Sequence, residues 1–449
     1  MKMINLITKT LIAFVVFCPA LLLNQSIKLD FGISYIPGID VLSAEATKKR
    51  KTRKTPAMRE RIYSQLARAQ KLADENKVDE GLAVLDNVKS RANQLNSYEK
   101  AMLWNFYGFI YYGKEDSENA VKAFEKVVEQ KNIPESLELS TLFSLSQLSM
   151  AAENYTDALA YLDQWVKIKD GKFSDNALIL KANAHYALKQ YSESLNAVTM
   201  AVENSFSQGK LPKENWLVLK RALHYELKQA RNMVTVSEQL VRHYSKAKYW
   251  IELANMYGES DQSDKQLAVM EAAYQQGFVT KRSDIQTLAQ LYFLTGAPYK
   301  SAELLSESIE SGLVLENIKI LNYLAQAWMS AKEIDKAVPV LARAANMSKS
   351  GNIDARLAEA YLELGQWENA IDAAINAKQK GSLDKPGNAD IALGIAYFNL
   401  NKFSQAIESF ETASNSSKQK RMAKQWLSYT EKEKYKFEQL QLQLGSIGS

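Results

Sequence analysis

Residues 101–134 read AMLWNFYGFIYYGKEDSENAVKAFEKVVEQKNIP, and they contain the clearest structural pattern in the chain. Gly108 and Tyr111 are three positions apart, so they share one face of a helix. After a polar turn, Ala120 and Phe124 lie four positions apart, on one face of a second helix. Glycine and alanine at facing positions let two helices approach closely, and the phenylalanine fills the space between them. The stretch therefore predicts two packed antiparallel helices that end at its closing proline.

The same pattern recurs along the chain at spacings of 33 to 39 residues. A single helix pair cannot bury its apolar face alone, whereas stacked pairs bury their faces against one another. We therefore predict an all-α solenoid of about ten helix pairs. The expected contact residues on the second helix of each pair are Gly81, Ala120, Ala158, Ser194, Met233, Leu267, Ala302, Ala337, Ala370 and Ala406.

The predicted organisation places four repeats in residues 57–210 and six in residues 211–420. The division falls at the fifth unit, which lacks a small contact residue, and residues 208–214 could act as a hinge between the two segments. Residues 421–440 combine aromatic and charged side chains and are expected to form a capping helix, because a terminal repeat needs a more polar outer face. Residues 441–449 are expected to form a flexible tail.

Residues 1–46 have the features of an export signal. Two lysines come before an apolar run at 11–23, which is short for a membrane-spanning helix, and an Ala-Glu-Ala cleavage pattern closes the segment. A cleaved signal predicts a periplasmic protein of a Gram-negative bacterium. Two alternatives stay open: a lipoprotein signal ending at Cys18, and an uncleaved inner-membrane anchor at 6–23 that leaves the chain facing the periplasm.

Residues 47–56 contain six basic side chains. Such a run is typical of a solvated, disordered tether, and it could also contact anionic lipid head groups.

The whole chain carries a net charge of only +5, from 56 basic and 51 acidic residues. That balance does not indicate a nucleic-acid-binding protein, which would show a dense basic face.

The sequence offers little for catalysis. It has three histidines and one cysteine, and the cysteine lies in the segment that we expect to be removed. No nucleotide-binding, serine-hydrolase or zinc-protease motif is present. We therefore expect no catalytic residue, no cofactor and no metal site, and a protein that is not an enzyme.

The repeats resemble the tetratricopeptide family over residues 57–440. The resemblance rests on the order of tryptophan, glycine, tyrosine, alanine, phenylalanine and proline in residues 101–134, with a close copy at 393–410. It implies a right-handed superhelix whose concave surface, lined by the first helix of each pair, binds peptides or partner proteins.

A narrower resemblance concerns the basic junction at 46–63. An exported chain with such a junction before the repeats is similar to periplasmic tetratricopeptide proteins that accompany TonB energy-transduction systems of marine gammaproteobacteria. This implies an accessory role between an inner-membrane motor and outer-membrane receptors.

The alternative function is that of a solenoid that binds peptidoglycan or polysaccharide for an envelope export or polymer-synthesis system. Trp104 and Trp328 occupy packing positions rather than a sugar-binding face, which favours protein ligands.

Helix geometry predicts the partner-binding face, at the positions beside the small residue of each first helix. Amide side chains suit an extended peptide because they both donate to and accept from its backbone. Aromatic side chains in a partly dry groove are common binding hot spots. The alternative is that these residues pack on the neighbouring repeat. The candidate residues are Asn105, Phe109, Tyr112, Phe143, Gln147, Asn183, Tyr186, Asn255, Asn322 and Gln326.

Overall fold

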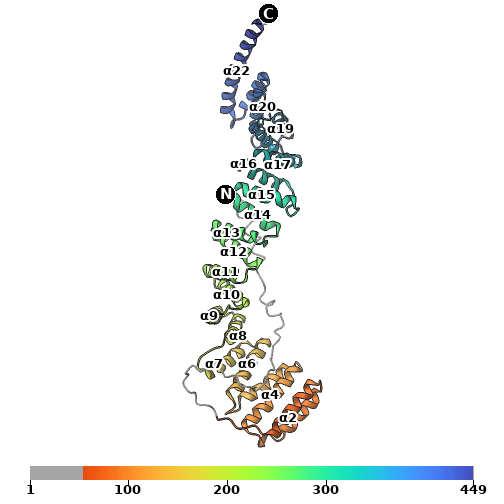
Figure 1. Ribbon diagram of the computed structural model, residues 1–449, viewed down its shortest axis with the longest axis vertical. Coiled ribbons are helices and arrows are strands. Elements are labelled where there is room, and N and C mark those ends of the chain that lie inside the picture. Colours follow the sequence, from red (N-terminus) through yellow and green to blue (C-terminus); the bar gives the residue numbers. More distant parts are fainter. Residues whose placement is uncertain (1–53, 448–449) are drawn as a thin grey trace. The chain divides into compact units, whose positions relative to one another are not determined.

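The computed structural model describes the backbone of residues 54–447 and side chains up to residue 442. Over that range the chain forms helices and contains no strand, and the helices follow one another from α2 to α22 in chain order (Figure 1). The predicted signal segment at 1–46 lies outside the described residues, as does most of the basic tether at 47–56.

Ten first helices alternate with ten second helices in the described range. The first helices are α2 (Glu60–Asp74), α4 (Ser97–Gly113), α6 (Glu135–Ala151), α8 (Asp175–Ala187), α10 (Glu214–Glu226), α12 (Ala247–Glu259), α14 (Arg282–Leu294), α16 (Ile318–Ser330), α18 (Asn352–Glu363) and α20 (Pro386–Asn399). The second helices are α3 (Val78–Lys89), α5 (Ser117–Val128), α7 (Tyr155–Ile168), α9 (Tyr191–Ser207), α11 (Ala230–Tyr244), α13 (Ser263–Gln275), α15 (Pro298–Glu310), α17 (Ile334–Met347), α19 (Trp367–Lys380) and α21 (Phe403–Ser414). A short 3-10 helix, η2 (Ala92–Gln94), connects the first two repeats. Each first helix packs on the second helix that follows it, and each second helix on the next first helix, which confirms the predicted solenoid.

The turn inside every repeat has the same geometry. One residue adopts a left-handed backbone, and the second helix begins two residues later. Eight of these ten residues are not glycine, although glycine adopts this conformation at the least cost. The turn residues are Asn76, Glu115, Glu153, Lys189, Lys228, Asp261, Gly296, Lys332, Gly365 and Asn401.

This turn fixes the register of the whole solenoid. The small residue of each first helix lies seven positions before the turn residue, and the contact residue of the second helix lies five positions after it. In α13 and α15 that contact residue is Gln266 and Ser301, one position before the predicted Leu267 and Ala302. The prediction was wrong there because two adjacent residues fit the spacing and only the turn distinguishes them.

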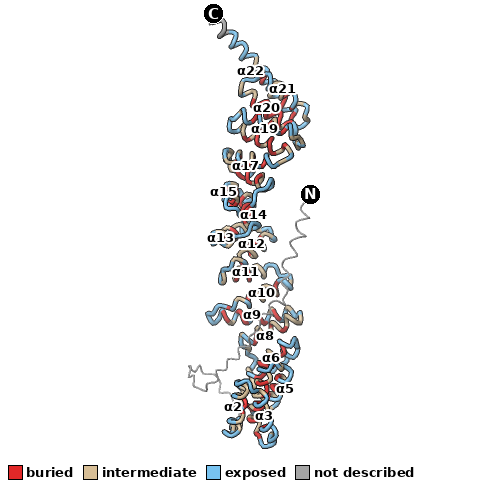
Figure 2. The backbone as a smooth tube through the Cα atoms, turned by 90° about the vertical axis from the view of Figure 1, so that its right-hand side faces the viewer, coloured by how far each residue is buried: buried red, intermediate tan, exposed pale blue. Residues whose placement is uncertain are grey.

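Small residues let the paired helices approach. A Cβ added to Gly81 would lie 2.7 Å from the carbonyl oxygen of Ala69, so the backbones of α2 and α3 are nearly in contact. In the fourth repeat the buried Ser194 hydroxyl donates to the carbonyl oxygen of Ala182 at 2.7 Å. Buried residues recur in helices along the described solenoid (Figure 2).

The fifth repeat departs from this pattern. Arg221 occupies the small position of α10, and Met233 occupies the contact position of α11. The Arg221 guanidinium donates to Glu252 of α12 and lies 5.6 Å from the centre of the Tyr249 ring. Helices α9 and α10 pack on each other across the predicted division at 210/211. The division itself remains a prediction.

The first helix pair is tied to the second repeat by a buried carboxylate. Glu99 is fully buried and accepts from the Arg59 guanidinium at 2.7 and 2.6 Å. It also completes a capping box with Asn96 at the start of α4. The side-chain hydrogen bonds from Arg59 lower the pKa of Glu99 to about 2.

The last helix, α22 (Lys420–Ile447), packs on α21 as the predicted cap. Trp426 stacks on Phe410 with 5.7 Å between ring centres, and it meets Phe398 of α20 at 5.8 Å. These rings close the end of the apolar core. The helix continues through residues 441–447, which were predicted to belong to the tail.

Candidate partner-binding face

The fixed register defines two sets of equivalent side chains on the first helices. The amide column is formed by residues one position after the small residue of their helices: Gln147, Asn183, Asn255, Gln290 and Gln326. The aromatic column is formed by residues four positions after the small residue: Tyr112, Tyr186, Tyr225, Phe293 and Phe398. The two positions are three residues apart and therefore lie on the same side of a helix, so both columns belong to one face.

The amide column has unused hydrogen-bonding capacity. Asn255, Gln290 and Gln326 are exposed, and the other two members are half-buried. None of the five side-chain amides makes a hydrogen bond to any residue between 54 and 447, whether side chain or backbone. Each can therefore donate to and accept from a ligand without breaking an existing bond. Gln70 holds the same position in α2 but is left out of the column, because its amide donates to Asp74 at 2.9 Å.

The aromatic column lies beside these amides, partly inserted between repeats. Tyr112 packs with Phe109 against the buried Leu145 and Leu148 of α6, and burial raises its pKa. Tyr186 meets the Tyr191 ring at 5.7 Å between ring centres. These tyrosine rings are held in place while part of their surface stays accessible, as an ordered binding anchor requires.

Tyr225 is the most open member of the aromatic column, with 60% of its surface exposed. Sequence reasoning missed it because Arg221 occupies the place of the small residue that marks the register. Gln290 was missed although it directly follows Ala289, a small residue that fits the repeat pattern. The small position and the contact position are always twelve residues apart, so counting back from Met233 would have found Arg221 and therefore Tyr225.

Three predicted residues are half-buried, and two of them make contacts within the solenoid. Asn105 is half-buried on α4, and Phe143 is half-buried in a cluster with Leu142 and Leu162. The Asn322 side-chain oxygen Oδ1 accepts from the Arg356 guanidinium, so this side-chain amide links α16 to α18. Asn322 is therefore partly committed to packing, in line with the alternative interpretation of these positions.

The described part of the chain contains neither a metal-binding cluster nor a membrane-spanning helix. No group of three or more histidine, cysteine or carboxylate side chains able to hold a metal ion occurs in the described part of the chain. Among the helices between residues 54 and 447, none is long and apolar enough to cross a membrane.

Comparisons with known proteins concern the repeats. The family model for the tetratricopeptide repeat matches residues 101–133 and 391–420. No curated protein matches the chain. Many solved structures are similar to it.

Three of these structures illustrate the range of sequence identity and coverage. MamA AMB-1 is 22% identical, with a TM-score of 0.31 and coverage of 37% of this chain and 95% of its own. YrrB, described as a tetratricopeptide-repeat protein with an unusual peptide-binding site, is 14% identical, with a TM-score of 0.34 and coverage of 41% and 94%. A tetratricopeptide-repeat protein from Parabacteroides merdae is 12% identical, with a TM-score of 0.28 and coverage of 57% and 98%.

The two matched segments fall in the second and tenth repeats. The eight remaining repeats of the described range have the same turn, the same twelve-residue spacing and the same pairing of helices. The described part of the chain therefore has the fold of a tetratricopeptide-repeat solenoid, and the family model matches two of its ten repeats.

Proposed function

We propose that the chain is an interaction scaffold that binds an extended segment of another protein along its first helices. The amide column carries this proposal. Its five amides, at equivalent positions of their helices, lack hydrogen-bond partners among residues 54–447. An extended peptide presents alternating backbone donors and acceptors, and a row of amides can satisfy both.

The aromatic column would supply the apolar part of the interaction. Tyr112 and Tyr186 are half-buried before any partner binds, so little side-chain entropy remains to be lost on binding. Tyr225 offers a larger exposed ring. Tyrosine is enriched among binding hot spots because it combines apolar area with a polar tip.

We further propose that the scaffold works in the periplasm, as an accessory component of a TonB-type envelope complex. This proposal rests on the signal-like residues 1–46 and on the basic junction that follows them. It would be tested by cell fractionation with protease protection. A chain that stays in the cytoplasm would overturn this part of the proposal and leave the peptide-binding part intact.

The alternative is a solenoid that binds peptidoglycan or another polysaccharide. One observation favours it: the open Tyr225 ring could stack on a sugar. Against it, all seven tryptophans are buried or half-buried, so none presents a broad exposed ring. The balance favours a protein ligand.

Site-specific photo-crosslinking in cells tests the proposal. A photoreactive residue would replace Tyr112, Tyr186 or Tyr225, with Tyr299 on the second helix α15, 41% exposed, as the matched control. We expect one protein to be captured from the first-helix positions and not from Tyr299. Capture from Tyr299 alone would contradict the proposal, and retention on a purified polysaccharide without protein capture would favour the alternative.

A further inference from the structure

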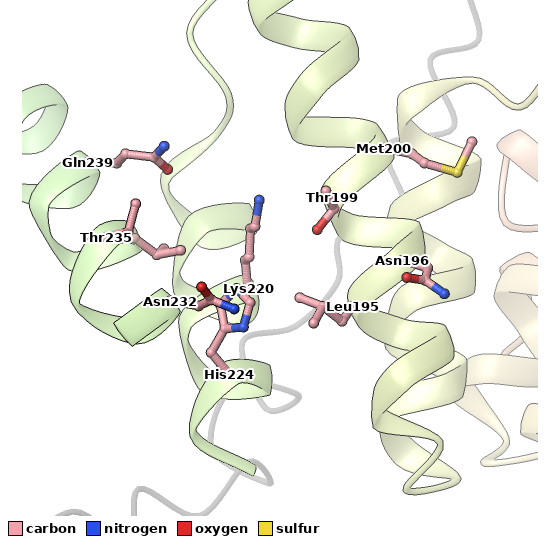
Figure 3. Close-up of a pocket in the computed structure, with 10 residues that line it drawn as sticks. Leu195, Asn196, Thr199, Met200, Lys220, His224, Asn232, Thr235 and Gln239 are labelled. Carbon is pink, nitrogen blue, oxygen red and sulfur yellow. The ribbon is translucent and has the colours of Figure 1, made fainter. Parts of the chain in front are cut away.

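A pocket of about 680 Å³ opens on the side of the solenoid formed by second helices. Helices α9 and α11 form its walls and α10 its floor (Figure 3). The Lys220 side chain extends from α10 between the walls, with Thr199 on one side and Thr235 and Gln239 on the other (Figure 3). This site shares no residue with the amide or aromatic columns.

Lys220 occupies a position that is apolar in most repeats. It comes directly before the small position of its first helix, where six other repeats have a buried leucine. Those residues are Leu145, Leu253, Leu288, Leu324, Leu357 and Leu393. A half-buried ammonium group at a core position costs free energy unless an anion compensates for it.

No carboxylate pairs with Lys220 in the described part of the chain. The ammonium group makes no hydrogen bond or ion pair with any residue in that range. Burial lowers its pKa, and the charge of Glu203 acts less strongly in the opposite direction. The pocket therefore holds a cation whose environment already disfavours its charge.

The fourth repeat shows how such a lysine is compensated elsewhere in the solenoid. Lys181 occupies the equivalent position of α8, 3.7 Å from the Asp163 carboxylate of the preceding second helix and 4.9 Å from the centre of the Phe173 ring. The residue of α9 that corresponds to Asp163 is Thr199, which lines the pocket. The fifth repeat therefore keeps the lysine and has a hydroxyl in place of its counter-ion.

Two further groups shape the pocket. The side-chain carbonyl oxygen of Gln239 is buried and accepts no hydrogen bond from the described residues. His224 has only 6% of its surface exposed, and its Nδ1 lies 2.7 Å from the Gln229 side-chain oxygen. A ligand would thus meet a cation at Lys220 and an unused acceptor at Gln239.

We infer that this pocket binds a carboxylate group, with Lys220 as its counter-charge, on a ligand that also carries an N–H or O–H donor for Gln239. Two sources share this chemistry. One is a free amino or hydroxy acid, and the other is an acidic side chain of a bound protein, whose backbone supplies the donor.

Binding measurements on the full chain test the inference with two probes. Free glutamate would be measured by calorimetry, and a fluorescein-labelled peptide of alternating glutamate and glycine by fluorescence anisotropy. Lys220→Leu removes the cation and installs the leucine of six other repeats, so we expect it to fold. Thr199→Asp supplies an internal counter-ion at the register of Asp163. Lys181→Leu is the matched control.

We expect the unmodified chain to bind at least one probe, and both pocket variants to bind it at least tenfold more weakly. The Lys181→Leu variant should bind as the unmodified chain does. Binding of glutamate would identify a free acid, whereas binding of the peptide alone would identify an acidic segment of a partner. The inference is overturned if neither probe binds the unmodified chain better than Lys220→Leu, or if Lys181→Leu weakens binding equally.

Discussion

Gly108 lies directly against the Phe124 ring, so that a Cβ added to the glycine would stand 2.5 Å from Cε1 of the phenylalanine. The ring is almost fully buried and cannot move aside freely. This contact sets the separation of α4 and α5. A small residue recurs at the same position in nine of the ten repeats between residues 54 and 447, with Arg221 as the exception.

We predict that Gly108→Ala destabilises the chain by about 1–3 kcal/mol, because overpacking forces buried side chains out of position. Gly113, the last residue of α4, has open space around it and is the matched control. Gly113→Ala should leave stability unchanged or raise it slightly, because alanine is a better helix former. Urea unfolding followed by circular dichroism measures both variants. Equal stabilities for the two would contradict the assigned register.

The turns predict a second, stabilising change. Glu153 adopts a left-handed backbone with φ of 60°, which is unfavourable for a non-glycine residue. Glu153→Gly should raise stability by about 0.5 kcal/mol, since relief of this cost exceeds the greater entropy of glycine in the unfolded chain. Glu129, which directly follows α5 and has φ of −68°, is the control, and Glu129→Gly should not stabilise. A melting temperature that falls for Glu153→Gly would count against the turn geometry.

The ion pair between the buried Glu99 and the exposed Arg59 predicts a pH dependence. The pKa of Glu99 is lowered in the folded chain from 4.5 to about 2, so its stabilisation is fully present above pH 4.5 and is lost as the pH falls towards 2. Glu99→Gln removes the charge and should cost about 2 kcal/mol at pH 7, because the hydrogen bonds to a charged group are lost.

The difference in stability between the unmodified chain and Glu99→Gln should shrink below pH 4.5 and vanish near pH 2. Urea unfolding at several pH values measures it. Glu75→Gln serves as the control, since Glu75 is exposed and pairs only with Lys77 at 3.2 Å. A difference at Glu99 that stays constant with pH would show that the carboxylate is not held by Arg59.

The capping helix predicts a local effect. Trp426→Ala removes the half-buried ring stacked on Phe410 and should destabilise the last repeat by about 2 kcal/mol. Hydrogen exchange should then speed up in α20 and α21 and stay unchanged in α4. Tyr435 is 64% exposed on the same helix, so Tyr435→Ala should leave exchange unaltered. Uniform acceleration along the whole chain would mean that α22 does not act as a local cap.

The fold could be predicted because the periodic small and apolar residues of a solenoid are visible without tertiary information. Gly108 and Ala120 could be paired from spacing alone. The turn could not be predicted in detail, because residues such as Glu153 and Lys189 adopt a left-handed backbone that their type does not favour. That backbone is stabilised by the packing of the two helices on either side.

The candidate face was predicted only in part, for a similar reason. Gln147 and Asn183 follow recognisable small residues, whereas Tyr225 follows Arg221 and could be placed only from the turn.

The role of Lys220 in the pocket could not be predicted from the sequence, because a lysine in a helix usually lies on a solvated face. Its significance comes from the leucines at the same position in other repeats and from the absence of a carboxylate at Thr199.

The most direct test of the central claim is the affinity of the captured partner for a chain whose amide column is truncated. The variant would carry Asn183→Ala, Asn255→Ala and Gln290→Ala, and the control would carry Gln164→Ala and Gln275→Ala, which truncate exposed amides on second helices. We expect at least tenfold weaker binding by the amide-column variant and unchanged binding by the control. Equal affinities for the two would contradict the claim that the first helices bind the partner.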